Sequence, residues 1–210
     1  MGQITYRPYA PQDFNALSEI INATWGHEKS YSLTTAVRLS NACLRLCLTE
    51  QTFTQVALYN GNPIGVIMGN SFRRAHKSLK NRFQARCALL ILSLTAEGRR
   101  AWHFYEEIDQ IYEKLPSRQS QDYEGELTFL AIHPGYRGLG IGKELYRRFF
   151  AYMNSENIQH FYVFTDTTCN YGFYEGQKLL LCGTEDVTLP VNGSPKQFLF
   201  FIYENLAGRT

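Results

Sequence analysis

The hydrophobic pattern changes its period once between residues 126 and 153. Residues 126–132 alternate every second position, which predicts a strand with two distinct faces. One face is expected to carry Leu127, Phe129 and Ala131, and the other Glu126, Thr128, Leu130 and Ile132. After a turn, apolar residues recur every four positions, which predicts a helix with the buried stripe Ile141, Leu145, Phe149 and Met153. A strand, a loop and a helix are therefore expected in direct succession.

The pattern before this stretch predicts a strand at 4–8, a helix from Pro11 and a helix at 33–49. The second helix is expected to bury Leu33, Val37, Leu44 and Leu48. Strands at 53–59 and 64–72 are joined by Asn60-Gly61-Asn62-Pro63, a strong hairpin sequence. After the central helix we expect a strand at 158–165, a short helix, and a closing hairpin of strands 184–189 and 197–203 around Asn192-Gly193-Ser194-Pro195.

Residues 73–121 lie between the third strand and the central strand, where a turn would be long enough. Two helical patterns fill this segment, the first marked by Leu79, Phe83, Leu90 and Leu94, the second by Trp102, Tyr105, Ile108, Tyr112 and Leu115. The joint between them is expected at 95–98. We therefore predict an inserted helical hairpin. Its charged faces leave three readings open: a solvated surface, a cover over an acceptor site, or a dimer contact.

Composition excludes several classes of protein. The net charge of +2 implies neither a nucleic-acid surface nor an acidic tail. No apolar run approaches the ~20 residues that span a bilayer, and the N-terminus has no signal-peptide pattern, so neither a membrane nor secretion is expected. Five cysteines without a Cys-x-x-Cys pair suggest reduced thiols in the cytoplasm and no metal site. At 210 residues, the chain is expected to form one domain.

The loop between the central strand and the central helix is rich in glycine. Backbone N–H groups at such a helix start have no partner within the helix and favour a bound anion. A P-loop is excluded because Lys143 is followed by Glu144, and the dinucleotide fingerprint fails because Lys143 occupies the place of its third glycine. The pattern that does fit is Arg-x-x-Gly-x-Gly, here Arg137, Gly140 and Gly142.

This pattern resembles the acyl-CoA motif of the GNAT superfamily of N-acetyltransferases. A second match lies downstream, where Phe173, Tyr174 and Glu175 resemble the Phe-Tyr-Glu signature of the same superfamily. The resemblance covers most of the chain except residues 73–121. It implies an α/β fold with a central mixed, mostly antiparallel sheet flanked by helices, into which the helical hairpin is inserted.

The resemblance also implies acetyl-CoA as co-substrate and assigns residues to it. The pantetheine arm is expected to pair with the backbone of Leu130, Ala131 and Ile132. The pyrophosphate is expected at the backbone of Arg137, Gly138, Leu139, Gly140, Ile141, Gly142 and Lys143. Asn170 is a further candidate contact to pantetheine, although it lies only four residues before Tyr174, closer than in the family.

Two catalytic roles follow from the chemistry of amide formation. The attacking amine must lose a proton and the departing thiolate must gain one. The resemblance implies Tyr174 as the acid, because it matches the tyrosine of the family's Phe-Tyr-Glu signature; the alternative is a core aromatic. It implies Glu126 as the base, because some histone-type relatives carry a catalytic glutamate at this place on the central strand; the alternative is a solvated carboxylate at a strand end. Glu124 is the second choice for the base. Cys169 has no histidine nearby in sequence to activate it, which disfavours a covalent acyl-enzyme.

Three functional classes remain open at this stage. The favoured one is an enzyme that moves an acetyl group from acetyl-CoA to a primary amine of a small molecule or peptide by direct transfer. The second is a catalytically inactive acyl-CoA-binding module that holds a partner through the inserted hairpin. The third is a structural or interaction protein whose glycines serve packing alone. Acceptor identity and a homodimer are not decided by the sequence.

Overall fold

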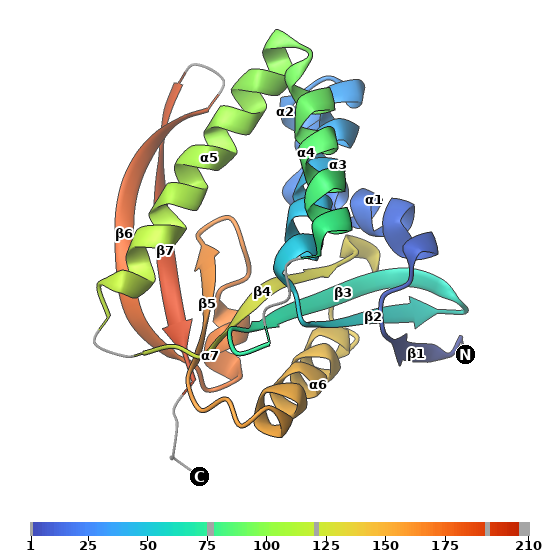
Figure 1. The fold of residues 1–210 in the computed structure, drawn as a ribbon, viewed down its shortest axis with the longest axis vertical. Coiled ribbons are helices and arrows are strands. Elements are labelled where there is room, and N and C mark those ends of the chain that lie inside the picture. The colour runs from blue at the N-terminus through green and yellow to red at the C-terminus, as the bar shows by residue number, and fades with distance from the viewer. Residues whose placement is uncertain (1, 75–77, 120–121, 192–193, 206–210) are drawn as a thin grey trace.

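A seven-stranded sheet forms the centre of the protein, in the order β1-β2-β3-β4-β5-β7-β6 (Figure 1). The computed structural model describes residues 2–74, 78–119, 122–191 and 194–205. Within these ranges the strands are β1 (Ile4–Arg7), β2 (Phe53–Tyr59), β3 (Asn62–Ser71), β4 (Gly125–Ile132), β5 (Phe161–Asp166), β6 (Leu180–Val191) and β7 (Ser194–Glu204). All neighbouring strands run antiparallel except β4 and β5, which are parallel. The predicted mixed, mostly antiparallel sheet flanked by helices is thus confirmed.

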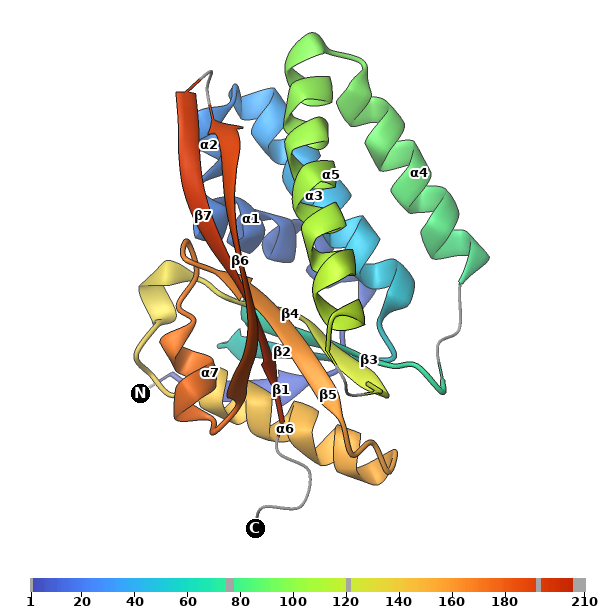
Figure 2. The same cartoon turned by 90° about the vertical axis from the view of Figure 1, so that its left-hand side faces the viewer.

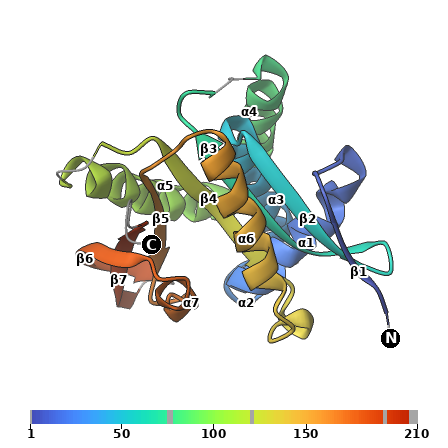
Figure 3. The same ribbon diagram turned by 90° about the horizontal axis from the view of Figure 1, so that it is seen from below.

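Helices cover the two faces of the sheet unequally. The helices are α1 (Phe14–Trp25), α2 (His27–Ser30), α3 (Leu33–Glu50), α4 (Leu79–Ser93), α5 (Ala96–Ser117), α6 (Ile141–Ser155) and α7 (Gly172–Gly176), with single 3-10 turns at Pro11–Asp13 and Pro134–Tyr136. Helix α6 lies across β2, β3 and β4 on one face, as seen from below in Figure 3. Helices α1 and α3 cover the other face, and α5 continues that layer toward β6 (Figures 1 and 2).

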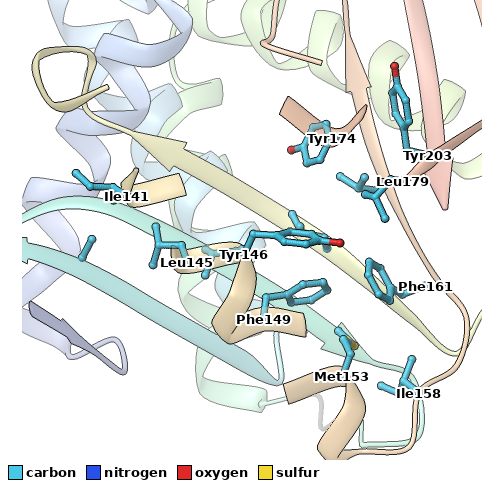
Figure 4. Packing of buried hydrophobic residues seen from close by; sticks show 14 of the residues in the cluster. Ile141, Leu145, Tyr146, Phe149, Met153, Ile158, Phe161, Tyr174, Leu179 and Tyr203 are labelled. Carbon is cyan, nitrogen blue, oxygen red and sulfur yellow. The ribbon is translucent and has the colours of Figure 1, made fainter. Parts of the chain in front are cut away.

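The central helix is held by the stripe that the sequence predicts. Ile141, Leu145, Phe149 and Met153 are each at most 1% exposed. Figure 4 shows them beside Phe161 and Ile158, which come from β5 and the loop before it. Burying four large apolar side chains stabilises the fold by roughly 2 kcal/mol each, so this stripe fixes α6 firmly against the sheet.

Helix α3 is found where the sequence predicts it, but only two of the four residues predicted to be buried are buried. Leu44 and Leu48 are buried, whereas Leu33 and Val37 are 67% and 44% exposed. The first turns of α3 instead bury the small side chains of Ala36 and Ser40, together with Thr35 and Leu39. The reason is that α4 and α5 pack against the start of α3, so its inward face there is set by neighbours that the local pattern does not reveal.

The helical hairpin between β3 and β4 is also found where the sequence predicts it. Thr95 caps α5, because its hydroxyl accepts a hydrogen bond of 3.0 Å from the Gly98 backbone N–H. The apolar residues that mark α4 nevertheless lie on its outer side: Leu79 is 81% exposed and Phe83 is 69% exposed. Helix α4 is apolar on several sides, and Ala85 and Leu92 are the residues that it buries. Figure 2 shows α4 as the outermost helix of this layer.

Both predicted hairpins have the expected pairing of strands. The β2–β3 turn places Asn60 and Gly61 at φ of 49° and 84°, a left-handed pair that glycine and asparagine tolerate. Strands β6 and β7 pair from Leu180 to Val191, further than predicted. The turn residues Asn192 and Gly193 between them lie outside the described residues.

Candidate active site

Strands β4 and β5 pair over only part of their length. Their parallel register runs from Gly125 opposite Phe161 to Leu127 opposite Val163, and neither strand pairs with the other beyond it. The later part of β4 continues to pair with β3 on its other side, up to Ile132 opposite Gly65. The backbone edge of Leu130, Ala131 and Ile132 that looks toward β5 is therefore free of strand partners. The sheet opens at this point.

A β-bulge next to this opening changes the face on which Glu126 lies. Met68 of β3 lies opposite Phe129 of β4, and Asn70 lies opposite Glu126. The two pairs are thus two residues apart along β3 but three residues apart along β4. The extra residue in β4 reverses the alternation of side chains. Leu127 therefore packs in the same cluster as Leu130 and Ile132, beneath α6.

The sequence prediction that Glu126 shares a face with Leu130 and Ile132 is therefore wrong. Glu126 lies on the opposite face, toward α3 and α5, together with Phe129 and Ala131, which pack in the cluster of α1 and α3. The cause is the bulge, because one inserted residue moves every side chain before it to the other side.

The Glu126 carboxyl group is a base of moderate strength in this position. The Tyr162 hydroxyl donates a hydrogen bond of 3.4 Å to it. Burial raises the pKa of Glu126 to about 7, and the negative charge of Glu50 at the end of α3 adds to the rise. A carboxylate with this pKa can take a proton from an ammonium group near neutral pH.

Glu124, the second choice for the base, has a structural role. Its carboxylate accepts hydrogen bonds from the backbone N–H groups of Gln159 (2.7 Å) and His160 (3.4 Å) and pairs with Arg73. These hydrogen bonds and the cation lower the pKa of Glu124. Its oxygens are thus engaged in holding the chain that leads into β5.

The glycine loop leaves an unusual set of backbone donors free. Gly138 and Gly140 adopt φ of 80° and 76°, and no atom of the described residues lies within 4 Å of the place that a Cβ on either would take. Within the described part of the chain, no protein acceptor bonds the backbone N–H groups of residues 138–143. Gly140 forms the N-cap of α6 without any side-chain cap. The loop is therefore a row of open N–H donors at a helix N-terminus, as an anion site requires.

A cavity of about 420 Å³ adjoins this loop. Its lining consists of Gly140, Lys143, Glu144, Tyr146, Arg147, Phe150 and Gln177. Glu144 is bound by Arg147 and Arg148 at 2.8 Å, and the hydrogen bonds to these arginines lower its pKa to about 2. Lys143 is exposed at the rim. Arg137 is also exposed, and its Nε lies 3.4 Å from the Ile132 carbonyl oxygen, which its N–H faces.

Tyr174 lies on α7, across the opening from β4. Its side chain is 8% exposed, and burial raises its pKa, so the hydroxyl stays protonated and can donate. Figure 4 shows the hydroxyl turned away from Leu179 and Tyr203. The Tyr203 hydroxyl donates a hydrogen bond of 3.0 Å to Glu175, which fastens α7 to β7. The tyrosine thus has a fixed support and a protonated hydroxyl.

The segment between β5 and α7 forms a turn before the short helix that the sequence predicts. Asp166 accepts hydrogen bonds from the backbone N–H (2.6 Å) and the hydroxyl of Thr168, so it closes a turn rather than capping a helix. The exposed Asn170 accepts the Phe173 N–H with its backbone carbonyl at 3.2 Å. Burial and the nearby Asp166 raise the pKa of Cys169, which keeps its thiol neutral.

Three residues near the opening were not predicted from the sequence. Tyr162 touches Glu126, Asp166 accepts a hydrogen bond of 3.4 Å from Tyr112 of α5, and Asn70 is the cross-strand neighbour of Glu126. Of these three, only Asp166 has a signal in the sequence, because it is an aspartate at the end of an apolar strand. The others depend on strand register and helix packing.

Neither a membrane-spanning helix nor a metal-binding group is found in residues 2–74, 78–119, 122–191 and 194–205. No helix in these ranges is long and apolar enough to cross a membrane. No group of three or more histidine, cysteine, aspartate or glutamate side chains within them is arranged to hold a metal ion.

Comparison with known proteins agrees with this arrangement. Residues 107–177 match the Acetyltransferase (GNAT) family, a span that contains the central strand, the glycine loop, α6 and α7. No curated protein matches the chain by sequence.

Several solved structures share the fold over nearly the whole chain. A GNAT-family protein from Desulfovibrio desulfuricans is 12% identical, with a TM-score of 0.55 over 98% of this chain and 100% of that one. A candidate phosphinothricin N-acetyltransferase is 13% identical, with a TM-score of 0.58 over 99% and 100%. A GCN5-related N-acetyltransferase from Rhodopseudomonas palustris is 15% identical, with a TM-score of 0.50 over 96% of each chain. The predicted resemblance to the GNAT superfamily is confirmed.

Proposed function

From a chain with the GNAT fold and a matching family segment, we propose an enzyme that transfers an acetyl group from acetyl-CoA to a primary amine by direct attack. The observation that carries this proposal is the row of backbone N–H groups from Gly138 to Lys143 at the start of α6, which have no hydrogen-bond partner among the residues that the structure describes. A diphosphate matches such a row, because its oxygens accept several N–H bonds and the helix dipole favours its charge.

The opening between β4 and β5 offers a path between the two faces of the sheet. Gly140 and Tyr174 lie at the α6–α7 side, where the cofactor would bind. Glu126 lies on the α3–α5 side, from which the amine would arrive. The unpaired edge of Leu130, Ala131 and Ile132 would bond the pantetheine arm between them. Asn170 is retained as a candidate contact to the same arm.

The proposed chemistry uses three proton transfers. Glu126 accepts a proton from the ammonium group, and the neutral amine nitrogen attacks the thioester carbonyl carbon to form a tetrahedral intermediate. Backbone N–H groups of the open β4 edge stabilise the oxyanion. The C–S bond then breaks, and Tyr174 gives its proton to the departing sulfur. The acylated nitrogen loses its second proton, which restores the Tyr174 hydroxyl through solvent. The products are an acetamide and free CoA.

The decisive experiment measures CoA release and CoA binding separately. Purified protein is incubated with acetyl-CoA and a panel of amines and peptides, and free thiol is followed. Calorimetry measures CoA binding in parallel. Turnover with any amine supports the enzyme. Tight CoA binding without turnover on any acceptor would favour an inactive CoA-binding module, and absence of CoA binding would contradict the site itself.

A further inference from the structure

Helix α4 of the inserted hairpin carries a line of large apolar side chains on its outer side. The line consists of Leu79, Phe83, Leu90 and Leu94, each of which is at least 67% exposed. Because these residues are separated by four, seven and four positions, they lie above one another along the helix. We call them the outer stripe. At ~1.5 Å per residue the stripe is roughly 20 Å long.

The inner side of α4 is fastened to α3. The Asn81 side chain donates a hydrogen bond of 2.8 Å to the Leu48 carbonyl oxygen, and Arg45 of α3 donates one of 2.7 Å to the side chain of Gln84. Leu92 is fully buried on the same side. Helix α4 therefore cannot roll inward to hide the outer stripe without breaking these contacts.

Every charged side chain on α4 is basic. Lys80, Arg82 and Arg86 are exposed, and the helix contains no aspartate or glutamate. With about 3.6 residues per turn, Arg82 and Arg86 lie on one side of the outer stripe and Lys80 lies on the other. Within the described part of the chain, none of these three side chains takes part in an ion pair.

The end of the outer stripe is also accompanied by a cation. Arg99 donates a hydrogen bond of 2.9 Å to the Ser93 carbonyl oxygen, which holds its guanidinium group beside the last turn of α4. Glu97 is the acidic residue nearest to Leu94 in the sequence, but its carboxylate accepts the backbone N–H of Ser32 at 3.0 Å and so faces the start of α3. Basic groups thus follow the stripe from its first turn to its end.

These charges decide which surface suits the outer stripe. An anionic bilayer presents charged headgroups above apolar chains, which matches an apolar line between basic side chains. Figure 2 shows α4 as the outermost helix of its layer, so a flat surface can reach the stripe. A second copy of the chain suits it less, because a two-fold contact would bring the basic side chains of both copies together, and α4 offers no acid to pair them.

We propose that the inserted hairpin binds an anionic membrane surface through the outer stripe of α4. The apolar side chains enter the boundary between headgroups and acyl chains, and the flanking basic side chains contact anionic headgroups. A helix that lies on the surface needs no apolar run of ~20 residues, so the sequence argument against a spanning segment does not apply to it. This inference is independent of the proposed acetyl transfer, because none of these residues belongs to the proposed site.

The first test measures binding of the unmutated protein to vesicles by co-sedimentation. One set of vesicles contains phosphatidylcholine alone, and the other an equimolar mixture of phosphatidylcholine and phosphatidylserine. We expect binding to the mixed vesicles to be at least about tenfold tighter, because each basic residue near an anionic surface is attracted to it. Raising the salt from about 0.1 M to about 0.5 M should weaken this binding about tenfold. Equal binding to both sets, or binding to neither, would overturn the inference.

The apolar contribution is tested by a pair of matched double variants. Phe83→Gln with Leu90→Gln keeps every charge and places a good helix former at exposed positions, and it should weaken binding to the mixed vesicles at least about tenfold. Leu180→Gln with Leu181→Gln changes exposed leucines on β6, at the far edge of the sheet, and should bind as the unmutated protein does. Unchanged binding in the α4 variant, or an equal loss in both, would contradict the role of the stripe.

The charges are tested by a second matched pair. Arg82→Gln with Arg86→Gln should remove most of the preference for mixed vesicles, about tenfold. Arg118→Gln with Lys196→Gln removes the same charge from the side of β6 and β7, where Arg118 pairs with Glu185, and should preserve the preference. An equal loss in both pairs would mean that net charge alone attracts the protein to the vesicles, and the inference would fail.

Light scattering without vesicles tests a second copy of the chain as the occupant of the outer stripe. We expect the Phe83→Gln, Leu90→Gln variant to have the same oligomeric state as the unmutated protein. A dimer of the unmutated protein that this variant abolishes would assign the stripe to a contact between copies and overturn the inference. None of these outcomes bears on acetyl transfer, which CoA release measures separately.

Discussion

Glu126 and Tyr162 lie opposite each other on neighbouring strands, and their side chains form a hydrogen bond. They oppose each other in the parallel register of β4 and β5, one step before the last paired residues, and the Tyr162 hydroxyl donates to the carboxylate at 3.4 Å. The base candidate is therefore fixed at the point where the strands separate. Burial raises the pKa of Glu126 to about 7, and this effect is larger than that of the hydrogen bond from Tyr162, which lowers the pKa.

The pH dependence of turnover should report this carboxyl group. A base works only when deprotonated, so kcat/KM should fall as the pH drops below about 7. Tyr162→Phe removes a hydrogen bond to the carboxylate, so the inflection should move to higher pH. Glu126→Gln should lower turnover by about 10² to 10⁴. A pH–rate profile unchanged in Tyr162→Phe would show that another group accepts the proton.

Gly140→Val should weaken CoA binding by more than about tenfold. The valine side chain would occupy the open space before the N–H donors. Valine is also strained at the φ of 76° found here, so a control variant must carry the same backbone strain. Gly61→Val is that control, because Gly61 also has a positive φ, of 84°, and open surroundings but lies in the distant β2–β3 turn. Calorimetry with both variants separates the two effects. Equal CoA affinity in them would contradict the phosphate cradle.

Tyr174→Phe should lower turnover by at least about tenfold, because proton donation to the sulfur is lost. A thiol has a pKa near ~8.5, so the thiolate leaves without help only at a cost in rate. The ring remains, and acetyl-CoA affinity should change by less than about threefold. Tyr152→Phe removes a hydroxyl from the far end of α6, where it bonds Thr52 at 2.9 Å, and serves as control. Full turnover in Tyr174→Phe would make this tyrosine a packing residue.

His27 should make stability depend on pH. The buried ring lies 2.7 Å from the Tyr105 hydroxyl and 2.8 Å from that of Ser40, and so joins α2, α3 and α5. Burial lowers its pKa to about 4, while an unfolded histidine titrates near ~6.5. Between these values the unfolded state binds more protons, so stability falls as the pH drops from about 6.5 to about 4.

Denaturant unfolding at several pH values checks this. The free energy of unfolding of the native protein relative to His27→Gln should decrease by roughly 2 kcal/mol between about pH 7.5 and about pH 5. His103→Gln changes a histidine whose side chain is 73% exposed and should show no such decrease. A constant difference between native protein and His27→Gln would mean that His27 is not held neutral.

Elements with a local cause could be predicted from the order of the residues alone. The stripe of α6, the glycines before it and the Asn60-Gly61 turn each depend on residues close together in the chain, and the structure has them as predicted. The position of the helical hairpin was determined in the same way. A glycine at positive φ or a four-residue apolar period constrains the backbone wherever the rest of the chain lies.

The faces that these elements present depend on contacts between elements distant in the chain. One extra residue in β4, visible only against its β3 partner, moved Glu126 to the side of α3 and α5. The outward stripe of α4 and the exposed start of α3 depend in the same way on neighbours distant in sequence. Asn70 of β3 and Tyr162 of β5 approach Glu126 from elements far apart in the chain, so no local pattern could bring them together. Register and packing are properties of pairs of elements, and the sequence of one element does not contain them.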